Sequence, residues 1–442
     1  MTVGAKHPTL VVFGITGDLA RKKIFSALYE LARAGRPLRR IVGVGRSDWS
    51  TSDLRRAAVE AVTAANLADG QGLDTFIESL TYVQGDYEKS ATFEAIAALV
   101  GGAELVLCYL AVPPTAFAEI AEGLGNSILA SRVRLLVEKP FGSDLRSALE
   151  LHADLEATLS PAQIFVVDHY LEKTLLQQLS FARQDKSALE ALWESECIES
   201  VEILMAEELG IEGRGEFFDS AGTIRDTIQN HVLQLLTAVA METPESDTAD
   251  ALNDARYEVL RSVATLRHDD VVLGQYDGYL ETEGVDPLST TETYVRANIR
   301  VDNERWRNVV FTLISGKALA DNRVSVSISF RPSNAGRTEG ASGERKRLVI
   351  ELSPKQSVTL HLPALPTDCH VDAARDELLS ALDLCSHNQT DAYACVFEDA
   401  TDGDRRWFSR IDVVAESWRV VQDILRHDPP AVYSAGSWGP SA

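Results

Sequence analysis

The 442-residue sequence is poor in cysteine and contains no Cys-x-x-Cys pair. Its five cysteines are odd in number and widely spread, which argues against a disulfide framework, a zinc site built from paired cysteines and a dithiol redox centre. We expect reduced structural thiols, as found in compartments that keep cysteines reduced. They are Cys108, Cys197, Cys369, Cys385 and Cys395.

Long apolar runs are also missing. No stretch of about 18 apolar residues is available to span a bilayer, and residues 1–14 lack the apolar centre, about 7–15 residues long, of a signal peptide. We therefore expect a cytoplasmic protein that does not associate with membranes.

Positive charge is in deficit, because 42 Lys and Arg face 66 Asp and Glu for a net charge of -24. Such a chain repels nucleic acid and anionic membrane surfaces except at local basic patches. A phosphorylated substrate would have to be captured by a local cluster of cations. With 45% hydrophobic residues, the chain can bury a large core and should divide into two or more units.

The first 170 residues alternate between short apolar strands and amphipathic helices, which is typical of a doubly wound α/β domain. We predict that residues 1–170 form a Rossmann-like dinucleotide-binding domain. The predicted strands are residues 10–15, 39–45, 104–112, 133–140 and 163–170, and the predicted helices are residues 21–33, 53–67 and 143–159, the last with Ser143 as its cap.

From residue 171 onward the pattern changes to strict alternation of apolar and polar residues. This pattern predicts an antiparallel sheet with one covered face, so residues 171–442 should form an α+β domain with a large, mainly antiparallel sheet. A Gly/Ser-rich segment, residues 333–346, should be a surface loop. The predicted strands are residues 199–208, 271–279, 293–303, 308–316, 322–332 and 346–354, and the predicted helices are residues 223–242 and 371–385.

A glycine turn follows the first predicted strand, with Gly14 and Gly17 between that strand and a helix. This context lets the backbone approach a pyrophosphate and presents a helix N-terminus to its charge. The third glycine of the common G-x-G-x-x-G pattern is absent, and the less favoured alternative is that the turn is only a tight connection with no ligand.

The second predicted strand ends beside Arg46. A guanidinium there can pair with the extra phosphate of NADP, whereas an acidic residue would hold the ribose hydroxyls of NAD. Thr16 and Ser47 can add hydroxyl donors to the same anion, while Asp48 favours NAD. We expect NADP, with NAD not excluded; the alternative is that Arg46 is only a solvated loop charge.

Two further segments, residues 166–174 and 213–236, carry chemistry. They offer a buried-looking acid at Asp168, a histidine at His231 that can take a proton near neutral pH, and a lysine at Lys173 that can hold an anion. Together with the glycine turn they suggest a dehydrogenase of a phosphorylated sugar. Taken alone, His231 could be a polar helix residue satisfied by a neighbour.

Twelve short strings in order make the chain resemble the glucose-6-phosphate dehydrogenase family from about residue 10 to residue 440. They are FGITGDLARKK, GVGRSDWS, YLAVPP, EKPFG, DHYLEK, GRGEFFD, IRDTIQNHVLQLL, LGQYDG with STTETY, NERW, SGKAL and YSAGSWGP.

The resemblance implies metal-independent oxidation of the C1 hydroxyl of glucose 6-phosphate to 6-phosphogluconolactone, with hydride transfer to NADP, in the pentose phosphate pathway. It makes His231 the base and Asp168 the carboxylate that orients it. It places Lys139 between coenzyme and substrate, and it implies a cis peptide before Pro140. It further implies a homodimer or homotetramer in which the sheet of the second domain serves dimerisation.

The resemblance also assigns the binding residues. The substrate phosphate would be held by His169, Tyr170 and Lys173, and Lys317 would bring a second cation. Glu207 and Asp226 would hold sugar hydroxyls, although each could instead belong to a structural ion pair. The implied coenzyme contacts are Gly14, Thr16, Gly17, Asp18, Leu19, Arg46 and Lys139. Lys173 follows His169 by four residues, which on a helix would place both on one face.

The chain departs from the family in the sugar pocket. Glu172 replaces a glycine, Asn322 takes the place of an arginine with Arg323 one position later, and Ser353 replaces a glutamine. These departures leave two alternatives: a dehydrogenase of a related sugar or cyclitol phosphate in a specialised pathway, or a catalytically silent paralogue. We expect Glu172 to face solvent, since glutamates are rarely buried; it could instead point to the phosphate or contact a different substrate.

Overall fold

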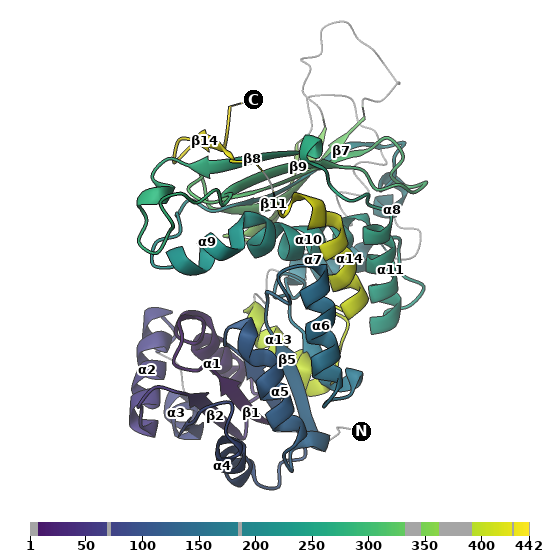
Figure 1. Cartoon of the computed structure of the whole chain (residues 1–442). Helices are drawn as coiled ribbons and strands as arrows, with labels where there is room; N and C mark the ends of the chain where they lie inside the picture. Colours follow the sequence, from purple (N-terminus) through teal and green to yellow (C-terminus); the bar gives the residue numbers. More distant parts are fainter. Residues whose placement is uncertain are drawn as a thin grey trace, which may run out of the picture. The chain divides into compact units, whose positions relative to one another are not determined.

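The computed structural model describes residues 8–68, 72–183, 188–331, 346–361, 391–426 and 428–441. The chain divides into two compact units, which are described separately (Figure 1). The first unit is Met1–Glu172 with Thr390–Ile411, and the second is Lys173–Gln389 with Asp412–Ala442. The chain passes from the first unit to the second between Glu172 and Lys173. Placing all later residues in the second domain is wrong, because residues 391–411 pack into the core of the first unit.

The first unit is built on a six-stranded parallel sheet with the order β3-β2-β1-β4-β5-β6. Its central strands are almost wholly apolar and buried, as expected when helices cover both faces of a parallel sheet. The Rossmann-like prediction is confirmed. The strands are β1 (Thr9–Phe13), β2 (Arg40–Gly45), β3 (Leu80–Gln84), β4 (Val106–Leu110), β5 (Val133–Val137) and β6 (Ile164–Val166).

The helices of this unit agree with the apolar periodicity, with additions. Helices α3, α4, α5 and α13 and strand β3 were not predicted. The helices are η1 (Ala20–Ile24, one π-helical turn), α1 (Phe25–Arg33), α2 (Thr51–Ala64), α3 (Leu73–Ser79), α4 (Ser90–Val100), α5 (Phe117–Gly125), α6 (Leu145–Glu156) and α13 (Ala392–Asp402).

Two local predictions in this unit are wrong. The cap of α6 is Asp144 rather than Ser143, because the Asp144 carboxylate accepts the Ser147 amide at 2.7 Å and closes a capping box. The last strand was expected to run to residue 170, but β6 ends at Val166 and the chain continues as turns.

The second unit contains an eight-stranded sheet with the order β13-β12-β11-β7-β10-β9-β8-β14. All six predicted strands are present, and β13 and β14 are additional. Most pairs are antiparallel as expected, but β7 pairs with β10, and β8 with β14, in parallel. The strands are β7 (Ile198–Ala206), β8 (Val271–Tyr276), β9 (Tyr294–Ile299), β10 (Val310–Gly316), β11 (Arg323–Phe330), β12 (Arg347–Ser353), β13 (Ser357–His361) and β14 (Ala431–Tyr433).

A long helical stretch packs against β7 and β10. It is the predicted helix of residues 223–242, observed as η5 (Ile224–Val232, π-helical) continued by α10 (Leu233–Ala240). The predicted helix of residues 371–385 and most of the predicted loop lie outside the described residues. The other helices are α7 (Thr174–Ala182), α8 (Ala188–Leu192), α9 (Gly215–Thr223), α11 (Ala249–Arg261) and α14 (Ile411–Val421).

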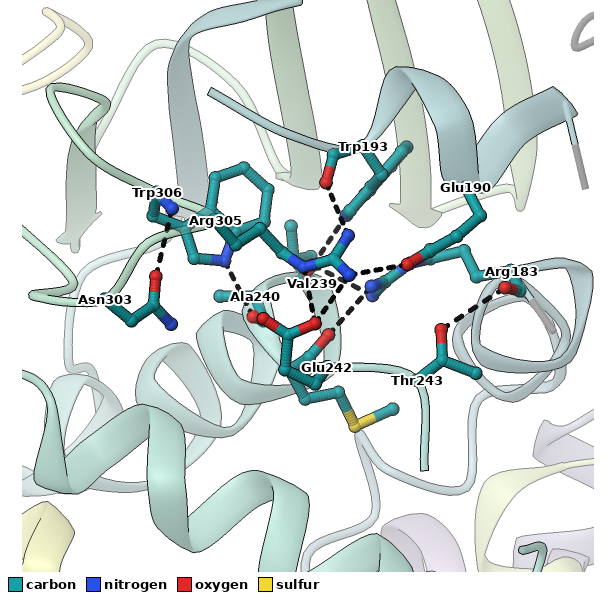
Figure 2. A network of polar contacts seen from close by, with 11 residues as sticks. Arg183, Glu190, Trp193, Val239, Ala240, Glu242, Thr243, Asn303, Arg305 and Trp306 are labelled. Atoms are coloured by element: carbon teal, nitrogen blue, oxygen red, sulfur yellow. Dashed lines mark hydrogen bonds and ion pairs between the residues drawn. The ribbon is translucent and has the colours of Figure 1, made fainter. Parts of the chain in front are cut away.

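The C-terminal end of α10 is held by buried side chains that donate to its last carbonyls (Figure 2). The indoles of Trp193 and Trp306 donate to the carbonyls of Val239 and Ala240, each at 2.7 Å. Arg183 donates to Val239 at 3.2 Å and to Met241 at 2.8 Å. These donors replace the hydrogen bonds that a helix end lacks.

None of the described helices is both long and apolar enough to cross a membrane.

Candidate active site

The glycine turn lies in the first unit where β1 meets its neighbours β2 and β4, the point at which the strand order reverses. Gly14 has a φ of 80°, and a Cβ there would lie 2.1 Å from the Ala111 carbonyl oxygen, so only glycine fits. The Gly17 amide closes the turn on the Gly14 carbonyl at 2.9 Å. The following helix η1 has no side-chain cap, so its N-terminus can receive an anion. The turn therefore fits a dinucleotide pyrophosphate.

The loop after β2 lies beside this turn. Ser47 Oγ lies 3.2 Å from Thr16 Oγ1, which joins the two loops through the hydroxyl groups expected to face one anion. Arg46 and Asp48 are both exposed. Arg21, which sequence reasoning missed, stacks over the Trp49 ring at 5.2 Å and brings another guanidinium to this loop. A guanidinium at this loop can pair with a phosphate group.

The side chains of Asp18 and Leu19, both predicted to contact the coenzyme, are occupied by neighbouring residues of the protein. Asp18 is exposed and pairs with Lys22 at 3.2 Å, while the half-buried Leu19 packs against the core of the unit. Their backbone positions at the start of η1 fit a coenzyme contact better than their side chains do.

Lys139 lies two residues beyond the buried end of β5, and the Lys139–Pro140 peptide is cis, as expected. Its neighbour Glu138 is 6% exposed and accepts the Tyr109 hydroxyl at 2.5 Å and the Lys139 amide at 3.3 Å. Burial raises the pKa of Glu138 to about 7, although both hydrogen bonds and the Lys139 charge act in the opposite direction. Glu138 thus fixes the backbone that carries Lys139.

The turn of residues 168–172 is tied to α13. Asp168 is 6% exposed, and its Oδ1 accepts the Tyr170 amide at 3.0 Å. The His169 ring stacks on Tyr393 with 5.1 Å between ring centroids and an interplanar angle of 21°. The Tyr170 ring also contacts the His169 ring, with 4.8 Å between their centroids. A helix more than two hundred residues away therefore orients the first part of the predicted phosphate site.

The suggestion that His169 and Lys173 lie on one face of a helix is wrong. Residues 169–172 form turns, and α7 begins only at Thr174, so the i, i+4 spacing does not place the two side chains on one helix face. Lys173 is the first residue of the second unit, and its carbonyl accepts the Leu176 amide at 2.9 Å. Its place in a phosphate site remains a prediction.

Glu172 does not face solvent. Its side chain is 2% exposed and lies close enough to Asp399 of α13 to influence the pKa of that carboxyl group. The sequence-based expectation failed because Asp399 lies 227 residues further along the chain.

The second unit gathers three predicted residues at the carboxyl ends of β7 and β10. Because these strands run in parallel with Ala206 opposite Gly316, Glu207 and Lys317 emerge side by side. Lys317 Nζ contacts the Glu207 carboxylate and lies 3.2 Å from Asp226 Oδ2. Burial alone would lower the pKa of Lys317, but Asp226 and Glu207 outweigh burial and raise it. The centre is a buried cation between two carboxylates.

His231 is 3% exposed and lies on η5. The start of η5 is held by Glu292, whose Oε1 accepts the Ile224 amide at 2.8 Å. Gly222 precedes it with a φ of 68°, and a Cβ there would lie 2.4 Å from Glu292 Oε1. Thr227 of η5 hydrogen-bonds Ser315 of β10 at 2.7 Å. His231 therefore sits on a helix fixed at its start and along its face; π-helical turns are frequent at functional sites.

The other positions at which the chain differs from the family pattern lie on β11 and β12 or next to these strands. Arg323 pairs with Asp321 at 2.7 Å and lies 3.6 Å from Glu351, so its charge is already balanced. Asn322 is exposed, and half-buried Ser353 ends β12. Nothing in these contacts points to a substrate other than the one the family resemblance implies.

Sequence reasoning missed the residues that position the site, chiefly Glu138, Glu292 and Tyr393. Glu138 lies in the family string EKPFG and Glu292 in STTETY. The available signal for Glu138 was a charged residue directly after an apolar strand. Tyr393 carried no local signal, because its role depends on the packing of α13.

The fold, the glycine turn and the polar residues of the second unit define the class of protein: a two-unit, dinucleotide-binding oxidoreductase. Residues 11–178 match the family model "Glucose-6-phosphate dehydrogenase, NAD binding domain", and residues 180–442 match "Glucose-6-phosphate dehydrogenase, C-terminal domain". The chain belongs to the glucose-6-phosphate dehydrogenase family, which confirms the resemblance stated from the sequence.

Individual relatives agree over nearly the whole length. Glucose-6-phosphate 1-dehydrogenase 1 of Mycobacterium tuberculosis is 40% identical over 99% of this chain and 94% of its own. The structure of glucose-6-phosphate 1-dehydrogenase from Mycobacterium avium is similar with a TM-score of 0.86 at 37% identity, covering 99% of this chain and 95% of its own. A glucose-6-phosphate dehydrogenase in complex with glucose 6-phosphate is similar with a TM-score of 0.86 at 31% identity, covering 98% and 96%.

Proposed function

We propose that this protein oxidises the C1 hydroxyl of glucose 6-phosphate to 6-phosphogluconolactone and transfers the hydride to NADP. The observation that carries the proposal is the buried Lys317 between Glu207 and Asp226, in a fold shared over 98% of the chain with a dehydrogenase solved with glucose 6-phosphate.

His231 is the proposed base. An imidazole with an ordinary pKa of about 6.5 can accept the C1 hydroxyl proton on one ring nitrogen, and a carboxylate at the other nitrogen fixes the tautomer. We assign that carboxylate to Asp168. When bound, NADP supplies the nicotinamide ring that accepts the hydride.

The remaining polar residues bind rather than react. His169, Tyr170 and Lys173 hold the phosphate, and Lys139 lies between coenzyme and sugar. Lys317, Glu207 and Asp226 bind the sugar: the two carboxylates accept hydrogen bonds from hydroxyls, and the lysine ammonium lies between them.

The coenzyme preference rests on Arg46, with Arg21 close to the same loop and the Thr16 and Ser47 hydroxyls joining the two loops. A bidentate guanidinium contact to the extra phosphate favours NADP. Use of NAD is compatible with the exposed Asp48.

We further propose that the enzyme acts in the cytoplasm in the pentose phosphate pathway, as a homodimer or homotetramer joined through the sheet of the second unit. A sugar phosphate is the expected small-molecule partner, and nucleic acid and membranes are not expected.

The test is NADPH formation with a panel of sugar phosphates. Glucose 6-phosphate should give the highest kcat/KM. A higher kcat/KM with another sugar or cyclitol phosphate would replace the proposed substrate, and no turnover with any of them would mark the protein as a silent binder.

A further inference from the structure

The C-terminal string YSAGSWGP, residues 433–440, has no part in the proposed reaction, yet it lies along the loop that follows β10. The Gly436 amide donates to the Ala318 carbonyl at 2.8 Å, and Ser437 forms an isolated parallel bridge with Leu319. The segment therefore contacts the residues directly after the buried lysine of the sugar-binding centre.

The hydroxyl of Tyr433, the first residue of this segment, ends a chain of buried hydrogen bonds. It lies 2.6 Å from the Lys317 carbonyl, 3.3 Å from the Thr293 carbonyl and 3.0 Å from Thr293 Oγ1. A hydroxyl has one proton to donate, and the nearest carbonyl receives it. The Thr293 hydroxyl then donates to Tyr433 and accepts the Tyr276 amide at 3.0 Å. Three hydrogen bonds in series thus end on the Lys317 carbonyl.

The backbone of Lys317 is held on both sides of its Cα atom. Its amide donates to the Thr293 carbonyl at 2.9 Å, and its carbonyl accepts the Tyr433 hydroxyl. The next residue, Ala318, has a φ of 49°, which residues with a Cβ atom seldom adopt, and its amide donates to the Leu209 carbonyl at 3.0 Å. Such backbone persists only where surrounding contacts outweigh its cost. The Tyr433 hydroxyl is one of those contacts.

The side chain of Lys317 depends on this anchorage. Its ammonium contacts Glu207 and lies 3.2 Å from Asp226, and the side chain is almost fully buried. Asp226 belongs to η5, whose first amide is accepted by Glu292 at 2.8 Å. Glu292 precedes Thr293 in the chain, so two neighbouring residues anchor the helix that carries the carboxylate and the loop that carries the cation. The separation of the two charges follows from these anchors.

We propose that Tyr433 is a positioning residue for substrate binding: its hydroxyl holds the Lys317 carbonyl and so keeps the ammonium where it binds the sugar, a role that rests on the proposed function of this centre. Without the hydroxyl, the turn at Ala318 loses a contact that offsets its backbone cost. Lys317 then shifts relative to Glu207 and Asp226. Sugar binding weakens, whereas the coenzyme turn lies in the other unit and keeps its contacts.

Tyr433→Phe tests this role, because it removes the hydroxyl and keeps the ring against Tyr276 and Tyr294. The KM for glucose 6-phosphate and its dissociation constant from calorimetry should both rise roughly five- to tenfold, as expected for the loss of one buried hydrogen bond. The kcat and the KM for NADP should change little.

Acylation of lysine amines gives a readout that does not depend on the substrate. Acetic anhydride reacts with a neutral, accessible amine. Lys317 is buried, and Asp226 and Glu207 raise its pKa although burial acts to lower it, so it should react slowly in the parent. In Tyr433→Phe, peptide mass spectrometry should show several-fold faster labelling of Lys317. The exposed Lys22 serves as the internal reference and should react equally in both proteins.

Two further variants complete the test. Tyr279→Phe is the matched control: it removes a hydroxyl from the same aromatic cluster and breaks a hydrogen bond to Asp219 at 2.7 Å. It should lower the melting temperature to a similar extent without changing the KM for glucose 6-phosphate or the labelling of Lys317. Thr293→Val removes the hydroxyl that donates to Tyr433 and should change both readouts in the direction of Tyr433→Phe. It carries the test if Tyr433→Phe does not fold.

The outcomes separate the two proposals. In an active parent, both readouts should change in Tyr433→Phe and neither in Tyr279→Phe; a change in only one readout, or equal changes in the two variants, overturns the positioning role and leaves the proposed function standing. A parent that does not oxidise glucose 6-phosphate overturns the proposed function. The labelling comparison then still decides whether Tyr433 fixes Lys317.

Discussion

Arg183 should be decisive for the helix that carries His231. Its side chain is 1% exposed, and its guanidinium joins Glu190 at 3.0 Å to the last carbonyls of α10 (Figure 2). Replacing it with methionine keeps the apolar stem and removes the charge together with three hydrogen bonds. Removing one partner from a buried ion pair costs about 3–5 kcal/mol.

The retained contacts place the cost of Arg183→Met at the lower end of that range. Glu190 keeps Arg305 at 2.7 Å, and the Val239 carbonyl keeps the Trp193 indole at 2.7 Å. The Met241 carbonyl loses the Arg183 donor that lies 2.8 Å from it. We expect a loss of about 3 kcal/mol in the local stability of α10.

Hydrogen exchange of the α10 amides measures this loss directly, because exchange reports the free energy of local opening. About 3 kcal/mol corresponds to roughly a hundredfold faster exchange of residues 233–240. Arg305→Met should accelerate it less, since Glu242 is 58% exposed and can return to water. The control is Arg261→Met, which breaks an exposed pair on α11 and should change exchange by less than tenfold.

An acceleration below tenfold in Arg183→Met would refute the argument that these buried donors hold the end of α10. Equal acceleration in Arg183→Met and Arg305→Met would show instead that charge balance matters more than burial.

Three further substitutions test the site. His231→Asn should lower kcat by roughly 10²–10⁴ with NADP binding unchanged, and activity within a few-fold of the parent would exclude His231 as the base. Arg46→Ala should weaken NADP by about 1.5–3 kcal/mol and hardly affect NAD; equal weakening in a titration of both coenzymes would shift ribose recognition to Asp48. Lys317→Met leaves Asp226 buried without its cation and should lower stability by about 3 kcal/mol in thermal melts, and adding Asp226→Asn should recover part of it.

The fold was predictable wherever a segment carried its own periodicity. The run Thr9–Phe13 and the alternating strands of the second unit are defined by residues within each strand, so they were found to within a few positions. Strand β3 and the cap of α6 were missed or misplaced because Leu80–Gln84 has little pattern and because Asp144 and Ser143 are both good caps.

The chemistry of the site was predictable where it lies in a recognised string, as for Lys317 and His231. Its orientation was not, because the deciding partners are remote in sequence. Glu172 had every local reason to face water, yet it is buried close to Asp399 on α13, far along the chain. Likewise, the parallel pairing of β7 with β10 that brings Glu207 beside Lys317 depends on sheet topology rather than on either strand.

The return of residues 391–411 to the first unit has a consequence for synthesis. Tyr393, Val396, Phe397 and Phe408 belong to the same buried cluster as the residues that surround the glycine turn. A ribosome that has released only the first 172 residues has therefore made all six strands of the coenzyme sheet, but not the helix that seals one side of its core. Coenzyme affinity should arise late, once more than nine-tenths of the chain has been translated.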